Sequence, residues 1–204
     1  MMRKIAMAVG ILMFSSTCVF AMSDRVGKFD AGFHVGGLVS DSGKVNAAAY
    51  YGGSVAYGVS DWFAVGVESG YGDSRTSFNI GGADHKALVS RIPLFVDLIF
   101  RYTKIEHDYV PYGVLGLGGL FTDIHGTGTL LSSNLKLDID NSFAVKIGAG
   151  IDWFVTERWM LNFETSYVWA DAEANVTNLA GGSTLDSARL DYWMVTGGFK
   201  YLFE

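Results

Sequence analysis

Ionisable residues at alternate positions are the features of this sequence best suited to chemistry. Small or apolar residues stand between them, which predicts that the ionisable side chains share one face of an extended chain. Charges gathered on a face that is withdrawn from water should pair, because unpaired buried charge is unfavourable. Such a network could fill space, or it could form a polar pathway or gate. Its predicted members are Asp30, His34, Glu68, Arg91, Asp97, Arg101, Lys146, Asp152, Glu164 and Lys200.

Histidine offers the other route to chemistry, since a catalytic nucleophile needs a base within hydrogen-bond reach. His34 has no serine in register on its own segment, and His125 has only Thr127 nearby, without an identifiable acid partner. His85 and His107 fall in predicted connections. The sequence also has no Cys/His metal spacing and no phosphate-binding glycine loop before a helix. We therefore predict no catalytic, cofactor-binding or metal-binding residues, and no enzymatic activity.

The stretch from Gly148 to Trp169, GAGIDWFVTERWMLNFETSYVW, indicates which elements position these residues. Large apolar residues alternate with small or polar ones on both sides of a short break at 156–158, which is the period of a strand. One face is apolar and the other polar, as in a membrane barrel with lipid outside and a polar lumen inside. A similar hairpin lies 96 residues earlier, over 55–71. The similarity could come from internal duplication, or from the same pattern that lipid and lumen impose on every barrel hairpin.

The chain has 204 residues, of which 50% are hydrophobic and 26 are glycine. Met1 to Ala21 resembles a signal peptide, with Arg3 and Lys4 before an apolar core and a small-residue cleavage site. Residues 22–204 then form one domain without an apolar run of about 18 residues, which argues against membrane helices. The lone Cys18 lies in the signal segment. Nucleic acid is not an expected partner, because residues 22–204 carry 21 acidic and 13 basic side chains.

Eight alternating segments predict an all-β fold, an eight-stranded antiparallel up-and-down transmembrane β-barrel. Three connections are short, near Asp61, 103–109 and Glu157, and four are long and polar, at 40–47, 72–87, 122–141 and 170–187. Short and long connections alternate, as expected for periplasmic turns and extracellular loops. Pro93 predicts a bulge or a strand end. The segments cover about 27–39, 48–59, 62–71, 88–102, 110–121, the two halves of 148–169, and 188–203.

A soluble eight-stranded ligand barrel would also alternate. It would place the bulky face inside and leave glycine, alanine and serine facing water, whereas soluble barrels have charged exteriors. The membrane barrel therefore fits better.

The runs IPLFVDLIFRY (92–102) and VPYGVLGLGG (110–119), with the 148–169 hairpin, resemble the outer-membrane β-barrel superfamily of OmpW-like, OmpX-like, opacity-type and OmpA-barrel proteins of Gram-negative bacteria. The resemblance implies a location in the cell outer membrane. It also implies contacts with outer-membrane lipid and lipopolysaccharide, and recognition by the barrel-assembly machinery. Phe199, Tyr201 and Phe203 resemble the family's assembly signal, in which alternating aromatic residues lead to a terminal phenylalanine. This sequence has one more residue after Phe203, Glu204.

The number of residues between each inward charge and the nearest short turn predicts its height in the barrel, and charges at the same height should lie close together. Asp30, Lys200, Arg101 and Asp152 should lie low, Arg91 and Lys146 high, and the others near mid-height. We expect Asp30 to pair with Lys200, because the first and last strands must meet. We also expect Asp97 to pair with Arg101 on one strand face.

Two functions remain open at this point. The leading one is a non-enzymatic structural or surface-binding role, in which four extracellular loops contact host, phage or envelope partners. The alternative is an OmpW-like conduit for small hydrophobic molecules. The inward apolar residues that could line such a conduit are Phe95, Ile99, Leu120 and Met160.

Overall fold

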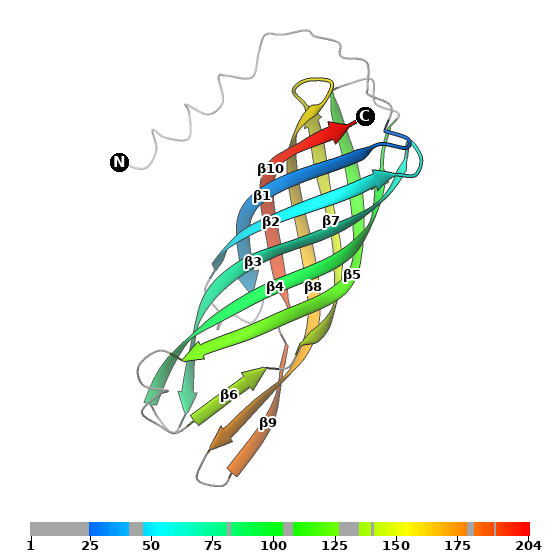
Figure 1. Ribbon diagram of the computed structural model, residues 1–204. Coiled ribbons are helices and arrows are strands. Elements are labelled where there is room, and N and C mark those ends of the chain that lie inside the picture. Colours follow the sequence, from blue (N-terminus) through cyan, green and yellow to red (C-terminus); the bar gives the residue numbers. More distant parts are fainter. Residues whose placement is uncertain are drawn as a thin grey trace, which may run out of the picture.

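The computed structural model describes residues 25–40, 47–80, 83–103, 108–126, 135–139, 141–178, 182–189 and 191–204. Within these residues eight antiparallel strands close into a barrel (Figure 1), which confirms the predicted fold. The predicted signal segment, 1–21, lies outside the described residues. The barrel strands are β1 (Phe29–Ser40), β2 (Ala48–Gly58), β3 (Phe63–Ile80), β4 (Ala83–Arg101), β5 (Tyr109–Gly126), β7 (Ser142–Phe154), β8 (Trp159–Asn178) and β10 (Tyr192–Phe203).

The barrel closes between its first and last strands. The β1–β10 ladder runs from Phe29 opposite Phe203 to Ser40 opposite Tyr192. Every other neighbouring pair is also antiparallel, in chain order around the wall. Closure leaves no free edge in the wall, so the backbone polar groups can be satisfied without water. No helix in the described part of the chain is long and apolar enough to cross a membrane.

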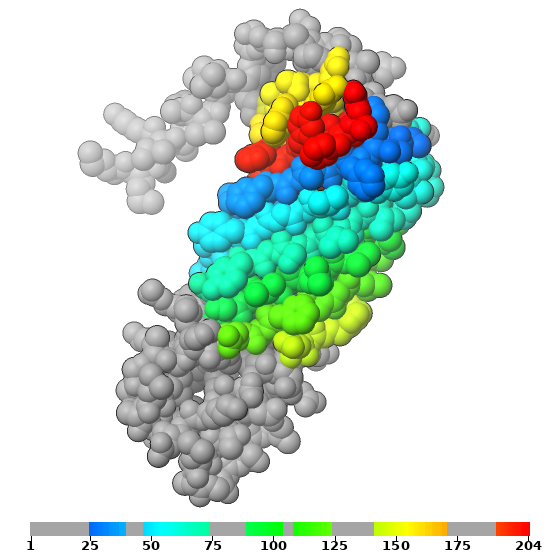
Figure 2. All heavy atoms as spheres, viewed as in Figure 1, coloured from blue at the N-terminus to red at the C-terminus, as the bar shows by residue number. Residues whose placement is uncertain are grey.

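The two faces of each strand divide as the alternation predicts. On β4, Ile92, Leu94 and Val96 are exposed, whereas Phe95 and Asp97 are buried inside. The outer wall therefore carries mostly large apolar side chains. Figure 2 shows side chains of neighbouring strands packed side by side along the wall. Such a surface is suited to lipid rather than to water.

Three of the predicted long connections contain long stretches of strand, and this corrects the prediction. The β3–β4 hairpin continues from Asp73 opposite Ser90 to Ile80 opposite Ala83, through the segment expected to be a loop. Likewise β5 runs to Gly126 and β8 to Asn178, where two short strands, β6 (Leu135–Ile139) and β9 (Gly182–Arg189), pair with β8. A strand beyond the bilayer needs no apolar face toward lipid, so it loses the alternation that reveals strands in sequence.

The two ends of the barrel differ. Short turns join β2 to β3, β4 to β5 and β7 to β8 at the end where the C-terminus lies (Figure 1). Arg25 also lies at this end, because the turn that contains it is hydrogen-bonded to Gly58 at the end of β2. In the last of these turns the Thr156 hydroxyl accepts hydrogen bonds from the backbone N–H groups of Arg158 (3.3 Å) and Trp159 (3.0 Å). We call this the short-turn end, and the opposite end, with the lengthened strands, the extension end.

Pro93 lies inside β4, so the predicted bulge or strand end is wrong. The β3–β4 register is the same on both sides of it, at Ser69 opposite Leu94 and at Gly72 opposite Arg91. The intervening positions, Gly70 and Tyr71, have no ladder partner on β4. Because proline has no N–H to donate, the ladder is interrupted without a shift of register.

Candidate functional site: ion networks in the barrel lumen

The lumen is built from side chains that the register places level with one another. Asp97 on β4 stands opposite Gly116 on β5, and Gly116 stands opposite Lys146 on β7. A Cβ at Gly116 would crowd the Asp97 carboxylate and the Lys146 side chain, so the glycine leaves the space in which these two residues meet. Strand pairing therefore brings together charges that lie 49 residues apart in sequence.

Lys146 is the centre of what we call the middle network, which also contains His34, Glu68, Asp97 and Glu164. Its ammonium group is fully buried and donates to Glu68 and to Asp97 Oδ2 (2.8 Å). Glu164 Oε1 is 3.6 Å away. Three carboxylates thus surround one lysine, an arrangement that confines the lysine to one place.

Glu68 has further partners on the other side of the lumen. His34 Nε2 lies 3.3 Å from Glu68 Oε1, and the Tyr50 hydroxyl donates to the same oxygen at 3.3 Å. The rings of His34 and Tyr50 stack with centroids 5.7 Å apart. The middle network therefore reaches across the lumen from β7 to β1 and β2.

A second group, the turn-side network, lies nearer the short turns and contains Arg25, Asp30, Arg101, Asp152 and Lys200. Arg101 donates to Asp30 Oδ2 at 2.8 Å. Asp152 accepts from Lys200 at 3.1 Å and from Arg25 at 2.9 Å. All five residues are at most 9% exposed, so these ion pairs are shielded from water.

Two polar side chains connect the networks. Asn162 donates from Nδ2 to Asp152 Oδ1 and to the Tyr112 hydroxyl, both at 2.8 Å. The Tyr112 hydroxyl in turn donates to Glu164 Oε2 at 2.8 Å. Glu164 Oε1 in turn lies 3.6 Å from the Lys146 ammonium, so hydrogen bonds and this ion contact connect Asp152 in one network to Lys146 in the other.

Apolar side chains close the lumen beyond each network. Val110, Phe154, Met160 and Leu202 form a buried cluster at the short-turn end. A larger cluster lies toward the extension end, where Arg91 sits with its guanidinium carbon 5.6 Å from the centroid of the Tyr192 ring. Its members are Leu38, Ala48, Tyr50, Phe95, Leu120, Ala144, Val168, Ala170, Tyr192 and Met194.

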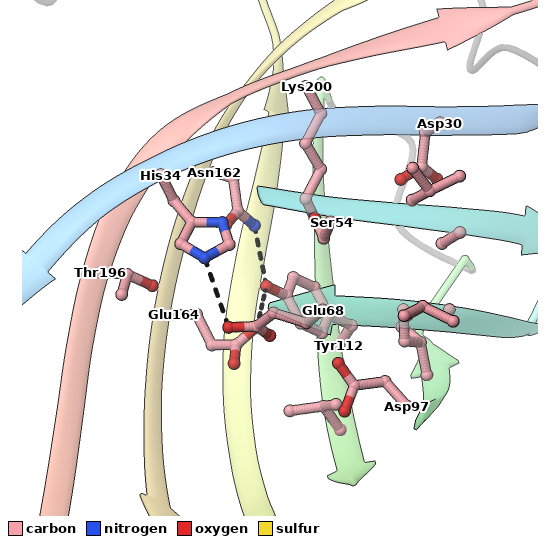
Figure 3. A pocket seen from close by; sticks show the side chains of 16 residues that line it. Asp30, His34, Ser54, Glu68, Asp97, Tyr112, Asn162, Glu164, Thr196 and Lys200 are labelled. Carbon is pink, nitrogen blue, oxygen red and sulfur yellow. Dashed lines mark hydrogen bonds and ion pairs between the residues drawn. The ribbon is translucent and has the colours of Figure 1, made fainter. Parts of the chain in front are cut away.

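A small cavity lies between the two networks (Figure 3). Asp30 and Lys200 line it on the turn side, and His34, Glu68 and Asp97 line it on the other. About 20 Å³ is available to the centres of water molecules, which is room for about one ordered water. In the described residues the lumen is therefore packed with side chains rather than open, as expected for eight strands.

The structure gives the two predicted ion pairs different partners. Asp30 pairs with Arg101 rather than with Lys200, and Asp97 pairs with Lys146 rather than with Arg101. Asp97 and Arg101 are four residues apart on one strand, which separates their Cα atoms by about 13 Å at 3.3 Å per residue. Arg101 reaches Asp30 across the lumen, and Asp97 meets Lys146 over Gly116 on the strand between them, so neither contact joins adjacent strands or residues of one strand.

The predicted height of Lys146 is also corrected, because it lies level with Asp97 in the middle network and not above it. Strands in a closed barrel are tilted and staggered, so counting residues from a turn does not give height. The other predicted groups agree with the structure, with Arg91 nearest the extension end. Four members were missed, Arg25, Tyr50, Tyr112 and Asn162. For Tyr50, Tyr112 and Asn162, the alternation in the sequence indicates that the side chain points inward, but not which residues it contacts.

Other predicted site residues lie outside the lumen. Phe199 and Phe203, with Tyr201 between them, face outward on β10, where a recognition factor could contact them. Of the histidines outside the lumen, His107 and the side chains of His85 and His125 lie outside the described residues. Among the side chains that the structure describes, no group of three or more His, Cys, Asp or Glu is arranged to hold a metal ion.

Comparison with known proteins identifies the wall as a known architecture. A family model described as "Outer membrane protein beta-barrel domain" matches residues 7–203. The chain is also 28% identical over 67 residues to the outer-membrane protein y4mB of Sinorhizobium fredii. That match covers 33% of this chain and 29% of the relative, so it spans less than a third of the relative's length.

Solved structures share the fold over nearly their whole length. OprG from Pseudomonas aeruginosa has a TM-score of 0.77 at 18% identity, with 89% of this chain and 98% of OprG covered. Outer membrane protein W of E. coli has a TM-score of 0.60 at 20% identity, with 88% and 99% covered. AlkL, solved in lipid bilayers, has a TM-score of 0.62 at 19% identity, with 94% and 97% covered. At these identities the likeness concerns the fold alone.

Proposed function

Since this chain belongs to the family of outer membrane protein beta-barrel domains and is located in the cell outer membrane, we propose that it is a non-conducting barrel that acts at the cell surface through its extension end. The observation that carries this proposal is the length of the strands at that end. The closed lumen supports it, because two apolar clusters and the two ion networks between them leave no continuous passage through the described residues.

The strand lengths indicate how far the extension end projects. Crossing the bilayer takes about 9–11 residues in a tilted strand. β3 has 18 residues and β8 has 20, so each continues for about eight residues or more beyond the bilayer. At about 3.3 Å per residue this amounts to roughly 25 Å of strand, or roughly 19 Å of height above the membrane at a tilt of about 45°.

The direction of the projection follows from the turns. Outer-membrane barrels place short turns in the periplasm and long connections outside the cell. The extension end is then the cell-surface end, where a host, phage or envelope partner would bind. Outer-membrane lipid and lipopolysaccharide would contact the apolar wall, and the outward aromatics of β10 would serve assembly.

Planar-bilayer recording tests the first half of the proposal. The protein purified from outer membranes, with its folding verified by a shift of gel mobility on boiling, should give no reproducible conductance steps. Regular steps would contradict the closed lumen and would support an ion pathway through the networks.

Shortening the β3–β4 hairpin tests the second half. Replacing residues 75–88 by a short turn keeps the pair Asp73–Ser90, so the barrel should still fold. Cells that display the intact protein should adhere to immobilised fibronectin or collagen, or aggregate, more than cells that display the shortened variant. Equal behaviour at equal surface amounts would argue against a surface-binding role.

A conduit for small hydrophobic molecules is the second candidate, and the interrupted ladder at Pro93 favours it. A shallow groove lined by Phe33, Tyr51 and Tyr71 lies on the outer face of β1, β2 and β3, and reaches the β3 side of the interruption at Tyr71. Inside it, Tyr50 covers Gly70, so an apolar region of the lumen stands behind an apolar groove in the wall. A solute could cross the wall here and bypass both ion networks.

Pro93→Val distinguishes this candidate, because valine supplies the N–H that the ladder lacks. Liposomes that contain the protein should take up a small apolar solute faster than empty liposomes, and Pro93→Val should slow that uptake. Uptake equal to that of empty liposomes would exclude the conduit.

A further inference from the structure

The chain enters the barrel through a tight turn that fixes Arg25 at the short-turn end. Lys28 N–H donates to the Arg25 carbonyl at 3.2 Å, and Gly27 N–H donates to the Gly58 carbonyl at 2.8 Å. Gly27 has φ of +75°, a conformation that favours glycine. A side chain at Gly58 would overlap the Arg25 carbonyl oxygen. The backbone before β1 is therefore held against the end of β2.

From this turn the Arg25 side chain reaches across the mouth of the barrel to β7 and β8. Its guanidinium donates to Asp152 Oδ2 at 2.9 Å and to the Met160 sulfur at 2.8 Å. The guanidinium carbon lies 4.7 Å from the centroid of the Phe154 ring. Since Phe154 and Met160 belong to the apolar cluster that closes this end, Arg25 covers that cluster and holds two sides of the mouth together.

Arg25 is the member of the turn-side network that can leave with the least electrostatic penalty. Without it, Arg101 still pairs with Asp30, and Lys200 still pairs with Asp152. Asp152 also keeps the hydrogen bond from Asn162. Two cations then match two carboxylates, whereas with Arg25 present three cations face two carboxylates. Lys146 is the opposite case, because three carboxylates depend on it.

We propose that Arg25 and the turn over residues 25–28 form a removable latch over the short-turn mouth of the lumen. With the latch in place, the cavity between the two networks is closed from that end. With the latch withdrawn, Asp152 is uncovered, and Phe154 and Met160 lose the contacts with Arg25 that hold them over the mouth, so water and small cations reach the cavity. Salt screens the charges of Arg25 and Asp152 once the latch has opened to water, so raised salt favours the open state. This device is independent of the surface and conduit functions proposed above.

Cysteine accessibility measures the latch directly. Ala56 lines the cavity and is 3% exposed, so Ala56→Cys places a small reactive group behind the latch. The full chain is produced with export to the outer membrane, purified, and treated with 2-aminoethyl methanethiosulfonate, a small cationic reagent. Mass spectrometry follows the labelling at position 56, so a cysteine elsewhere in the chain does not interfere.

Arg25→Ala in the Ala56→Cys protein should raise the labelling rate about tenfold or more, because losing a charge-assisted hydrogen bond shifts an opening equilibrium by that order. Molar potassium chloride should also speed the labelling of the Ala56→Cys protein with Arg25 in place. The matched control is Arg158→Ala, at the same end, whose partner Glu204 is in water. This control should leave the rate within about twofold, as exposed ion pairs contribute little.

Equal labelling rates with and without Arg25 would overturn the proposal. Gly58→Ala provides a second route, since it displaces the Arg25 carbonyl without removing a charge, and it should also speed labelling. If neither Arg25→Ala nor Gly58→Ala gives a barrel whose gel mobility shifts on boiling, the Arg25 contact is required for the folded barrel, and the latch is refuted.

Discussion

Replacing Lys146 by methionine should destabilise the barrel more than any other single change in the lumen. Methionine keeps most of the side-chain volume but removes the positive charge that Glu68, Asp97 and Glu164 share. Removing one partner of a buried ion pair leaves an uncompensated charge and typically lowers the free energy of unfolding by about 3–5 kcal/mol.

The structure indicates where this loss falls. Glu68 would keep the Tyr50 hydroxyl and His34, and Glu164 would keep the Tyr112 hydroxyl. Asp97 has Lys146 as its hydrogen-bond partner at Oδ2, and its Oδ1 has no hydrogen bond. Adding Asp97→Asn to Lys146→Met should therefore recover roughly 1–2 kcal/mol, because it removes the charge left alone.

Reversible urea unfolding in lipid vesicles, followed by tryptophan fluorescence, measures both effects. Arg158→Met is the matched control, since it removes an equal charge from an exposed pair with Glu204 and should change the free energy of unfolding by less than about 1 kcal/mol. The reasoning would be refuted if Lys146→Met were as stable as this control, or if the double variant were no more stable than Lys146→Met alone.

Two further changes test the packing of the lumen. Lys200→Met should lower the free energy of unfolding by about 1–3 kcal/mol, which is less than for Lys146→Met, because Asp152 keeps Arg25 and Asn162 as partners. The same urea titration measures this loss, and a loss equal to that of Lys146→Met would contradict the ranking. Gly116→Ala should lower the free energy of unfolding by about 1–3 kcal/mol, because the added Cβ crowds the middle network. Gly113→Ala on the same strand is the control and should be close to neutral, since its added Cβ would have nothing nearer than 3.9 Å. Equal unfolding midpoints for the two variants would show that the space at Gly116 is not needed.

The alternation of large apolar and small or polar residues was sufficient to predict the eight-stranded barrel. The register agrees with it on every barrel strand, because lipid outside and a filled lumen inside impose a period of two on each membrane-crossing segment. The hairpin around Trp153 and Trp159 shows this most clearly, with Asp152 and Asn162 opposite one another on the inner face. The family model that matches residues 7–203 agrees with this pattern, since it describes an outer-membrane β-barrel domain.

The alternation of apolar and polar residues does not predict strands outside the bilayer, because no lipid contacts them there. Beyond the bilayer the strands β3, β4, β5 and β8 continue through segments that alternate poorly, so the sequence pattern predicts loops there. Pro93 was misplaced for a related reason, because a closed wall can lose two ladder positions without losing register.

The sequence by itself determined which side chains face the lumen, since facing depends only on the parity of position within a strand. Tertiary structure alone decided which of them meet. Barrel tilt and stagger set Lys146 level with Asp97, and long side chains cross the lumen to partners on distant strands, as Arg101 does to Asp30. The role of Arg25 lay furthest from sequence reasoning. It precedes the first strand, and only the folded turn before β1 carries its side chain across the mouth to Asp152.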